Sequence, residues 1–242
     1  MMNKTQGICL RNTRYGDSSV VCRIFTSEFG ISSYLVQGIH RKTASIRPSH
    51  IAPGNIVDMV IYHKPGAGIQ RVKELRIQES LSSIHTDMVK NAILQFILEM
   101  VVKTNEEHLK DEIIFQYIRS TIVALEAEKE GINRFPLVFL CGYLRFTGWF
   151  PNLESYEEGY VFNLNEGQFE DPESSGISRK LDVEISKVLF ELLEAILNNQ
   201  SIVQMTPTVR HQLFTAMLQY YEIHILKGKK IHSPEILNEI LS

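Results

Sequence analysis

The chain has 242 residues, 44% of them hydrophobic, a normal content for a globular protein that argues against wholesale disorder. No apolar run approaches the ~18 residues needed to cross a bilayer, and the N-terminus lacks the apolar core of a signal peptide, so we expect a cytoplasmic protein. Residues 1–80 carry eleven Lys and Arg against five acids, a net charge of +6, whereas the remainder carries −9. This asymmetry indicates two units with different partners, and a polyanion for the first.

The first 80 residues predict five short strands. Alternation and β-branched residues indicate strands at 6–13, 20–26, 31–38, 55–63 and 69–77. Residues 39–54 form a longer basic connection, in which Pro48 and Pro53 disfavour a long helix. Five strands with a longer link between the third and the fourth match a small Greek-key barrel such as the OB fold.

After Gln78 the apolar residues recur at helical spacing. Helices are expected over 87–104, 111–130, 134–147, 181–198 and 207–227. Gly131 is expected to cap the end of the second, Thr206 and Pro207 to begin the last, and Gly228 to follow its end. The fold class is therefore α+β, with a five-stranded OB-fold barrel in residues 1–80. An α-helical domain follows in residues 81–242, with an irregular insertion at about 149–180 that contains a short ribbon or ordered loop.

Signatures of catalysis and metal binding are scarce. Gly66-Ala67-Gly68 lacks the lysine and the following helix of a phosphate-binding loop, so a hairpin turn is the better interpretation. The eight histidines show no metal-ligand spacing, and the three cysteines are far apart inside apolar segments, which predicts buried thiols. We expect no enzyme, no metal site and no cofactor.

Basic side chains of the barrel are expected on its outer face, because each stands opposite apolar neighbours on its strand. Barrels of this kind bind nucleic acid by combining a cationic groove with aromatic rings. Tyr15, Phe25, Phe29, Tyr34 and Tyr62 are available, although some must fill the barrel. The alternative is that these cations only confer solubility. The predicted DNA-binding residues are Arg11, Arg14, Arg23, Arg41, Lys42, Arg47, Arg71 and Lys73.

The last long helix carries an apolar stripe. It consists of Val209, Leu213, Met217, Tyr220 and Tyr221. Such a stripe is usually core. The functional alternative is that its edge, near Arg210, forms a pocket for a partner peptide.

Several short motifs follow one another in a characteristic order. In the basic half, Tyr15-Gly16-Asp17-Ser18-Ser19 is followed by Phe25-Thr26-Ser27-Glu28-Phe29-Gly30 and later by Tyr62-His63-Lys64-Pro65-Gly66. In the helical half the order continues with Gly148-Trp149-Phe150-Pro151-Asn152-Leu153, Tyr220-Tyr221-Glu222-Ile223-His224 and Ser233-Pro234-Glu235-Ile236-Leu237. This order resembles the RecO family of DNA repair proteins, and the resemblance spans nearly the whole chain.

The resemblance implies a recombination mediator without cofactor turnover. Such a protein binds single- and double-stranded DNA, anneals complementary strands and works with RecR and with single-strand binding protein (SSB), so that RecA loads onto SSB-coated DNA. The acidic, phenylalanine-ended SSB tail would dock on the helical half, with Arg210 or Lys180 at the pocket rim. The protein would be bacterial, cytoplasmic and nucleoid-associated, with no membrane contact.

One departure from the family is plain. Many relatives carry a four-cysteine zinc site after the motif at 148–153, but residues 149–180 contain no cysteine here. We therefore predict a zinc-free variant in which Tyr156, Tyr160, Phe162 and Phe169 pack in place of the metal. The alternative function is a protein–protein adaptor, whose barrel binds RecR or another protein rather than DNA.

Overall fold

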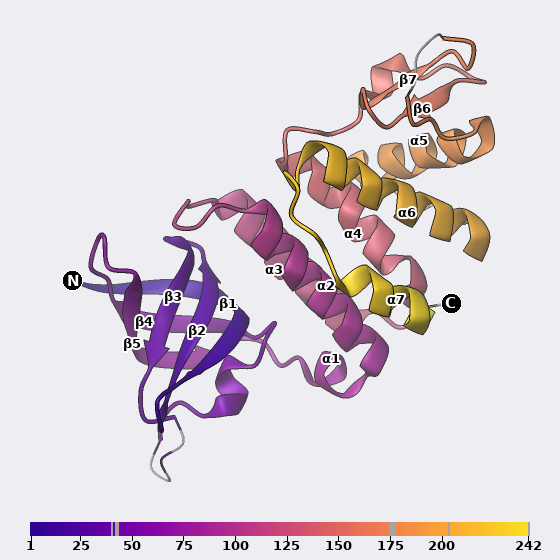
Figure 1. Ribbon diagram of the computed structural model, residues 1–242. Coiled ribbons are helices and arrows are strands. Elements are labelled where there is room, and N and C mark those ends of the chain that lie inside the picture. Colours follow the sequence, from indigo (N-terminus) through magenta and orange to yellow (C-terminus); the bar gives the residue numbers. More distant parts are fainter. Residues whose placement is uncertain (40, 42–43, 175–177, 203, 242) are drawn as a thin grey trace. The chain divides into compact units, whose positions relative to one another are not determined.

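The computed structural model describes residues 1–39, 41, 44–174, 178–202 and 204–241 (Figure 1). The chain forms two compact units, the first comprising Met1–Ile132 and Ile231–Ser242 and the second Asn133–Lys230. The chain thus leaves the first unit after the third helix and returns to it for the last one.

The first unit contains the predicted barrel. Its strands are β1 (Met2–Tyr15), β2 (Ser19–Thr26), β3 (Gly30–Val36), β4 (Ile56–Tyr62) and β5 (Ile69–Ile77). They close in the order β1-β2-β3-β5-β4, and only the β3–β5 pairing is parallel. This is the OB-fold arrangement, so the predicted fold class is confirmed.

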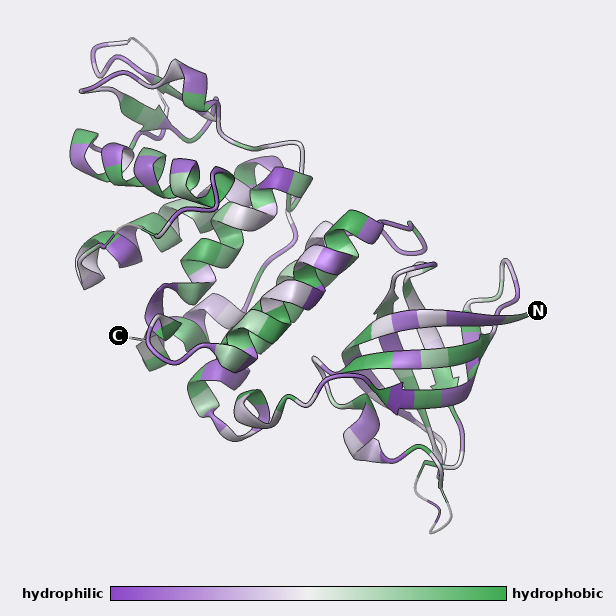
Figure 2. Ribbon diagram, turned by 180° about the vertical axis from the view of Figure 1, so that it is seen from behind, coloured by the Kyte–Doolittle hydropathy of each residue, from purple (hydrophilic) through white to green (hydrophobic). Residues whose placement is uncertain are grey.

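Apolar side chains of different sizes fill the barrel. Cys9, Ile24 and Met59 belong to its buried core. A Cβ on Gly7 would come within 2.6 Å of Ile24 Cγ2, so glycine is needed where β1 crosses the interior. Figure 2 shows the resulting alternation of hydrophobic and hydrophilic residues along the strands.

A bulge in β1 changes which side chains of that strand point into the barrel. Cys9 pairs with Ile24 but Arg11 pairs with Arg23, so Leu10 is an extra residue in β1. Simple alternation along β1 would place Ile8 on the face opposite Arg11. Instead Cys9 points inward, and Ile8 lies on the outer face beside its partner Phe25. Arg11 nevertheless points outward, because the bulge restores the alternation.

Where the structure describes the link between β3 and β4, that link contains a single turn of 3-10 helix, η1 (Pro48–Ile51), and no longer helix. The prediction that its prolines prevent a long helix is confirmed for the described part of the link. Ile39, Ile46 and Ile51 join the barrel core, so this basic segment is anchored by its apolar side chains.

Four helices complete the first unit: α1 (Ser82–Thr86), α2 (Met88–Thr104), α3 (Glu112–Ala127) and α7 (Ser233–Leu241). Phe115 of α3 packs edge-on against Phe25 at 5.6 Å between ring centroids, which covers part of the outer face of the barrel. The predicted cap at Gly131 is wrong. Helix α3 ends earlier, and the Glu128 carboxylate accepts the backbone N–H groups of residues 129–131.

The second unit contains α4 (Phe135–Tyr143), a hairpin of β6 (Val161–Asn163) and β7 (Gln168–Glu170), α5 (Val183–Leu197) and α6 (Pro207–His224). The helix predicted over 134–147 continues past α4 only as a 3-10 turn, η3 (Leu144–Phe146). Another 3-10 turn, η4 (Leu153–Ser155), precedes the hairpin. Thr206 caps α6 by accepting the Val209 N–H, as predicted. Most of the predicted α6 stripe is buried: Leu213, Met217, Tyr220 and Tyr221.

Candidate nucleic-acid interface

Two adjacent arginines start a cationic row across the exposed outer face of the barrel. Arg11 of β1 and Arg23 of β2 are cross-strand partners, and the row continues through Ser33 of β3 to Ile69 of β5. Since directly paired residues point to the same side of a sheet, both guanidinium groups lie on the outer face.

The next row adds a third arginine and an aromatic ring. Thr13, Val21, Leu35, Arg71 and Tyr62 are successive partners from β1 to β4. Tyr15 lies two residues beyond Thr13 on β1, hence on the same face. The two tyrosines are 57% (Tyr15) and 47% (Tyr62) exposed. We call this surface the arginine face: Arg11, Arg23, Arg71, Tyr15 and Tyr62.

The other half of the outer surface has a different charge pattern. Asp58 and Arg76 are cross-strand partners there, and Glu74 pairs with Val60, which in turn pairs with Lys4. These residues line an open groove of about 740 Å³, together with Lys110, whose ammonium group binds the Glu28 carboxylate at 2.9 Å. Acids and bases alternate in this groove, so it attracts a polyanion less strongly than the arginine face does.

Two of the predicted cations are partly neutralised by neighbours. Arg23 binds Glu107 of the α2–α3 loop at 2.6 Å, and Lys73 lies 3.6 Å from Glu74. Lys73 is the extra residue of a bulge in β5 and has no cross-strand partner. It therefore does not follow the alternation of inward and outward side chains that places Arg71 on the arginine face. Both ion pairs are exposed to solvent and are therefore weak enough for a phosphate to compete.

The remaining predicted cations lie elsewhere around the barrel. Arg14 pairs with the core residue Val20, which puts it on the opposite side of the β1–β2 ribbon from Arg11. Arg41 and Arg47 are exposed in the β3–β4 link, and Lys42 lies outside the described residues. The structure therefore places three predicted arginines in neighbouring rows of the outer surface and the other described cations elsewhere.

The five candidate aromatic side chains also lie in different environments, some buried and some exposed. Phe25 and Tyr34 are buried, whereas Phe29 stacks on His63 at 4.2 Å beside the β4–β5 loop. Only Tyr15 and Tyr62, of the five candidates, present an exposed ring. The β1 bulge and the strand register decide this selection, and neither was visible in the sequence pattern.

Comparison with known proteins identifies the family of the chain. Models of the recombination protein O N-terminal and C-terminal regions match residues 1–81 and 85–233. The chain belongs to the RecO family. DNA repair protein RecO of Azobacteroides pseudotrichonymphae is 29% identical over 242 residues, 99% of each chain. The RecO proteins of Bacteroides fragilis (26% identity over 99% of each chain) and Flavobacterium psychrophilum (26% over 100%) are similar along their whole length.

In this RecO-family chain an aromatic cluster occupies the region after residue 153, where many relatives carry the four-cysteine zinc site. Tyr156 stacks on Phe190 at 3.9 Å and meets Phe169 edge-on at 5.1 Å, and Phe162 lies 5.0 Å from Phe169. Tyr160, also predicted to pack here, is only partly buried. Among the described residues, no group of three or more His, Cys, Asp or Glu could hold a metal ion.

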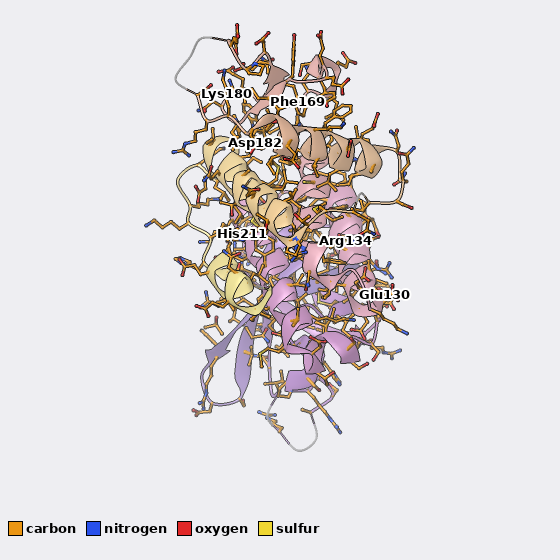
Figure 3. All side chains as sticks on the ribbon, turned by 90° about the vertical axis from the view of Figure 1, so that its right-hand side faces the viewer. Glu130, Arg134, Phe169, Lys180, Asp182 and His211 are labelled. Carbon is orange, nitrogen blue, oxygen red and sulfur yellow. The ribbon has the colours of Figure 1, made fainter. Side chains whose placement is uncertain are left out.

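The two basic residues predicted for partner binding lie in different surroundings. Lys180 binds the Glu170 carboxylate at 2.8 Å and donates to Ser174, so its charge is already engaged. Arg210 lies half-buried in the first turn of α6. Figure 3 shows Lys180 beside Phe169 at one end of the unit and His211, which follows Arg210, at another part of it.

The cysteines are buried and have low reactivity. All three thiols are free and buried. A hydrogen bond with Cys22, together with burial, raises the pKa of Cys9, and burial raises the pKa of Cys141 to about 12. Both thiols therefore stay protonated at neutral pH, which makes them poor nucleophiles. Within the described part of the chain, no helix is long and apolar enough to cross a membrane.

Proposed function

We propose that this protein is a non-enzymatic mediator of DNA repair and recombination. Its barrel, residues 1–80, binds single- and double-stranded DNA and anneals complementary strands. With RecR it helps RecA load onto SSB-coated DNA. The observation that carries the DNA-binding role is the arginine face, where three guanidinium groups and two exposed tyrosine rings lie on the outer surface of the barrel along neighbouring rows of cross-strand partners.

The arginine face suits a single strand because it combines two kinds of contact. Arg11, Arg23 and Arg71 neutralise phosphates, and the Tyr15 and Tyr62 rings stack on bases of any sequence. Binding is therefore tolerant of sequence and sensitive to salt. Annealing follows because cations on one surface lower the repulsion between two phosphate backbones.

A double charge reversal tests this assignment against a matched control on the same barrel. Arg11→Glu with Arg71→Glu removes two cations of the arginine face, and Lys4→Glu with Arg76→Glu makes the same charge change in the mixed groove. At about 0.1 M salt we expect the first variant to bind a labelled oligonucleotide at least tenfold more weakly, since two phosphate contacts are lost. The control should lose about twofold or less.

Equal losses in the two variants would mean that net charge alone attracts DNA and that the arginine face has no special role. Unchanged DNA affinity in the first variant would favour the adaptor function, in which the barrel binds another protein. Circular dichroism of all chains establishes that each variant is folded.

We further propose that the acidic SSB tail docks on the helical half beside Arg210. A carboxylate would pair with its guanidinium group, and the terminal phenylalanine would enter the adjacent apolar edge of α6. Lys180 could contribute only by giving up its ion pair with Glu170.

Titration of the full chain with the tail peptide checks this second proposal. Arg210→Glu should weaken peptide binding about tenfold or more, as expected for a charge-assisted contact. Lys187→Glu, on the exposed surface of α5, should leave it unchanged. Equal affinity in the wild type and the Arg210 variant would rule out this docking position.

A further inference from the structure

The only tryptophan of the chain, Trp149, forms a half-exposed platform in the second unit. Its ring stacks on His224 at 4.4 Å with 25° between the planes, and 46% of the residue is exposed. Because His224 covers one face of the indole, the exposure belongs largely to the other face. A large flat ring presented in this way is a stacking surface for a second planar group.

Hydrogen bonds fix the backbone at Trp149 and the His224 ring on which its indole stacks. The backbone N–H of Trp149 donates to Thr147 Oγ1, and that hydroxyl in turn donates to the Leu144 carbonyl. His224 contacts the Leu164 carbonyl through Nε2 at 2.8 Å and packs against the Tyr220 ring. Binding a planar ligand on the open face would therefore cost little ordering of the ring.

Four cations lie close to Trp149 or His224 in the sequence. Arg145 lies four residues before Trp149, and Lys227, Lys229 and Lys230 follow His224; all four are exposed. The chain turns back at Lys227 and Gly228, which have positive φ, so the lysines stay near the end of α6. The second unit has nine basic and twelve acidic residues. Four of the nine, but only Glu222 of the twelve, fall within 144–150 and 220–230.

We propose that Trp149 and these cations form a second contact for single-stranded nucleic acid, distinct from the arginine face and resting on the proposed DNA-binding function. A base stacks on the open face of the indole, and the flanking phosphates pair with Arg145 and the lysines. A peptide partner is the less favoured occupant, because a flat ring surrounded by cations matches the alternation of bases and phosphates along a strand.

Intrinsic fluorescence tests this site alone, since the barrel contains no tryptophan. Titration of the full chain with an unlabelled thymine oligonucleotide should quench Trp149 emission, because a stacked base quenches indole. Lys227→Glu with Lys230→Glu should weaken the quenching titration about five- to tenfold. Arg179→Glu with Lys187→Glu, two exposed cations of the same unit, should leave it unchanged.

Parallel anisotropy measurements on a labelled oligonucleotide separate the failure of this site from the failure of the proposed function. DNA binding without any quenching of Trp149 would overturn the second site and leave the arginine face intact. No DNA binding at all would overturn both proposals. Quenching by an acidic peptide but not by DNA would identify a protein partner instead and would also overturn the site.

Discussion

Glu99 illustrates how one side chain determines where a whole element lies. Its carboxylate, on α2, accepts hydrogen bonds from the backbone N–H groups of His232 and Ser233 and from the Ser233 hydroxyl. These donors belong to the start of α7, whose first N–H groups have no partner within the helix. Burial acts to raise the pKa of Glu99, but the hydrogen bonds from Ser233 and His232 outweigh it and lower the pKa.

Glu99→Gln should loosen α7 in a pH-dependent way. The folded pKa lies below the ordinary value of 4.5, so the charged carboxylate stabilises α7 above that pH and the stabilisation is lost as pH falls through the lowered pKa. At pH 7, amide hydrogen exchange in residues 233–241 should be about fivefold faster than in the wild type, since a charged cap contributes about 1 kcal/mol.

At a pH below the lowered pKa of Glu99, the wild type and the Gln variant should exchange α7 amides at similar rates. Glu106→Gln, on the exposed α2–α3 loop, is the control and should match the wild type at both pH values. An equal difference between Glu99→Gln and the wild type at the two pH values would show that shape, rather than charge, holds α7.

At the scale of elements, the sequence predicted the strands and helices that are determined by their own pattern of apolar residues. All five strands and the helices α2, α3, α5 and α6 were predicted close to their positions, because their apolar residues repeat with the period of the element. The short helices α1 and α7 were not predicted as elements. Glu126 caps α1 at Ser83 N and Ile84 N, and Glu99 caps α7, so both depend on carboxylates distant in sequence.

The predicted site, too, could be predicted only as far as local sequence patterns determine it. Alternation correctly placed Arg23 opposite Cys22 and Ile24, but the grouping of Arg11, Arg23 and Arg71 depends on strand register and on a bulge. Register is a long-range property that one strand's pattern does not contain. The ion pair between Arg23 and Glu107 could not be predicted either, because 84 residues separate the two.

The β6–β7 region should be stabilised by its aromatic cluster. Phe169→Ala removes a buried ring that contacts Tyr156, Phe162 and Phe190, and should lower the free energy of unfolding by about 3–5 kcal/mol. Tyr160→Ala, in the same hairpin but partly exposed, should cost about 1 kcal/mol or less. Thermal unfolding followed by calorimetry measures both.

A chelator provides the complementary test. Because side-chain packing holds this hairpin, EDTA should leave the unfolding temperature of the wild type unchanged. A decrease of several degrees with EDTA, reversed by added zinc, would show that a metal ion contributes to folding here.

At the scale of the whole molecule, the two units differ in how their charges are distributed. The first unit carries the arginine face, and the second combines an acidic composition with the localised cations around Trp149. Because an acidic second unit opposes non-specific attraction to DNA, we expect DNA binding to depend on where the cations are grouped rather than on net charge, which is −3 for the chain.

The salt dependence of DNA binding tests the central claim most directly. The affinity of the full chain for a single-stranded oligonucleotide should fall linearly with salt on logarithmic axes, and Arg11→Ala with Arg71→Ala should reduce the slope by about 1.4, or ~0.7 for each phosphate contact removed. Lys4→Ala with Arg76→Ala should leave the slope unchanged. A slope that is the same in the wild type and in the Arg11 and Arg71 variant would contradict the assignment of DNA to the arginine face.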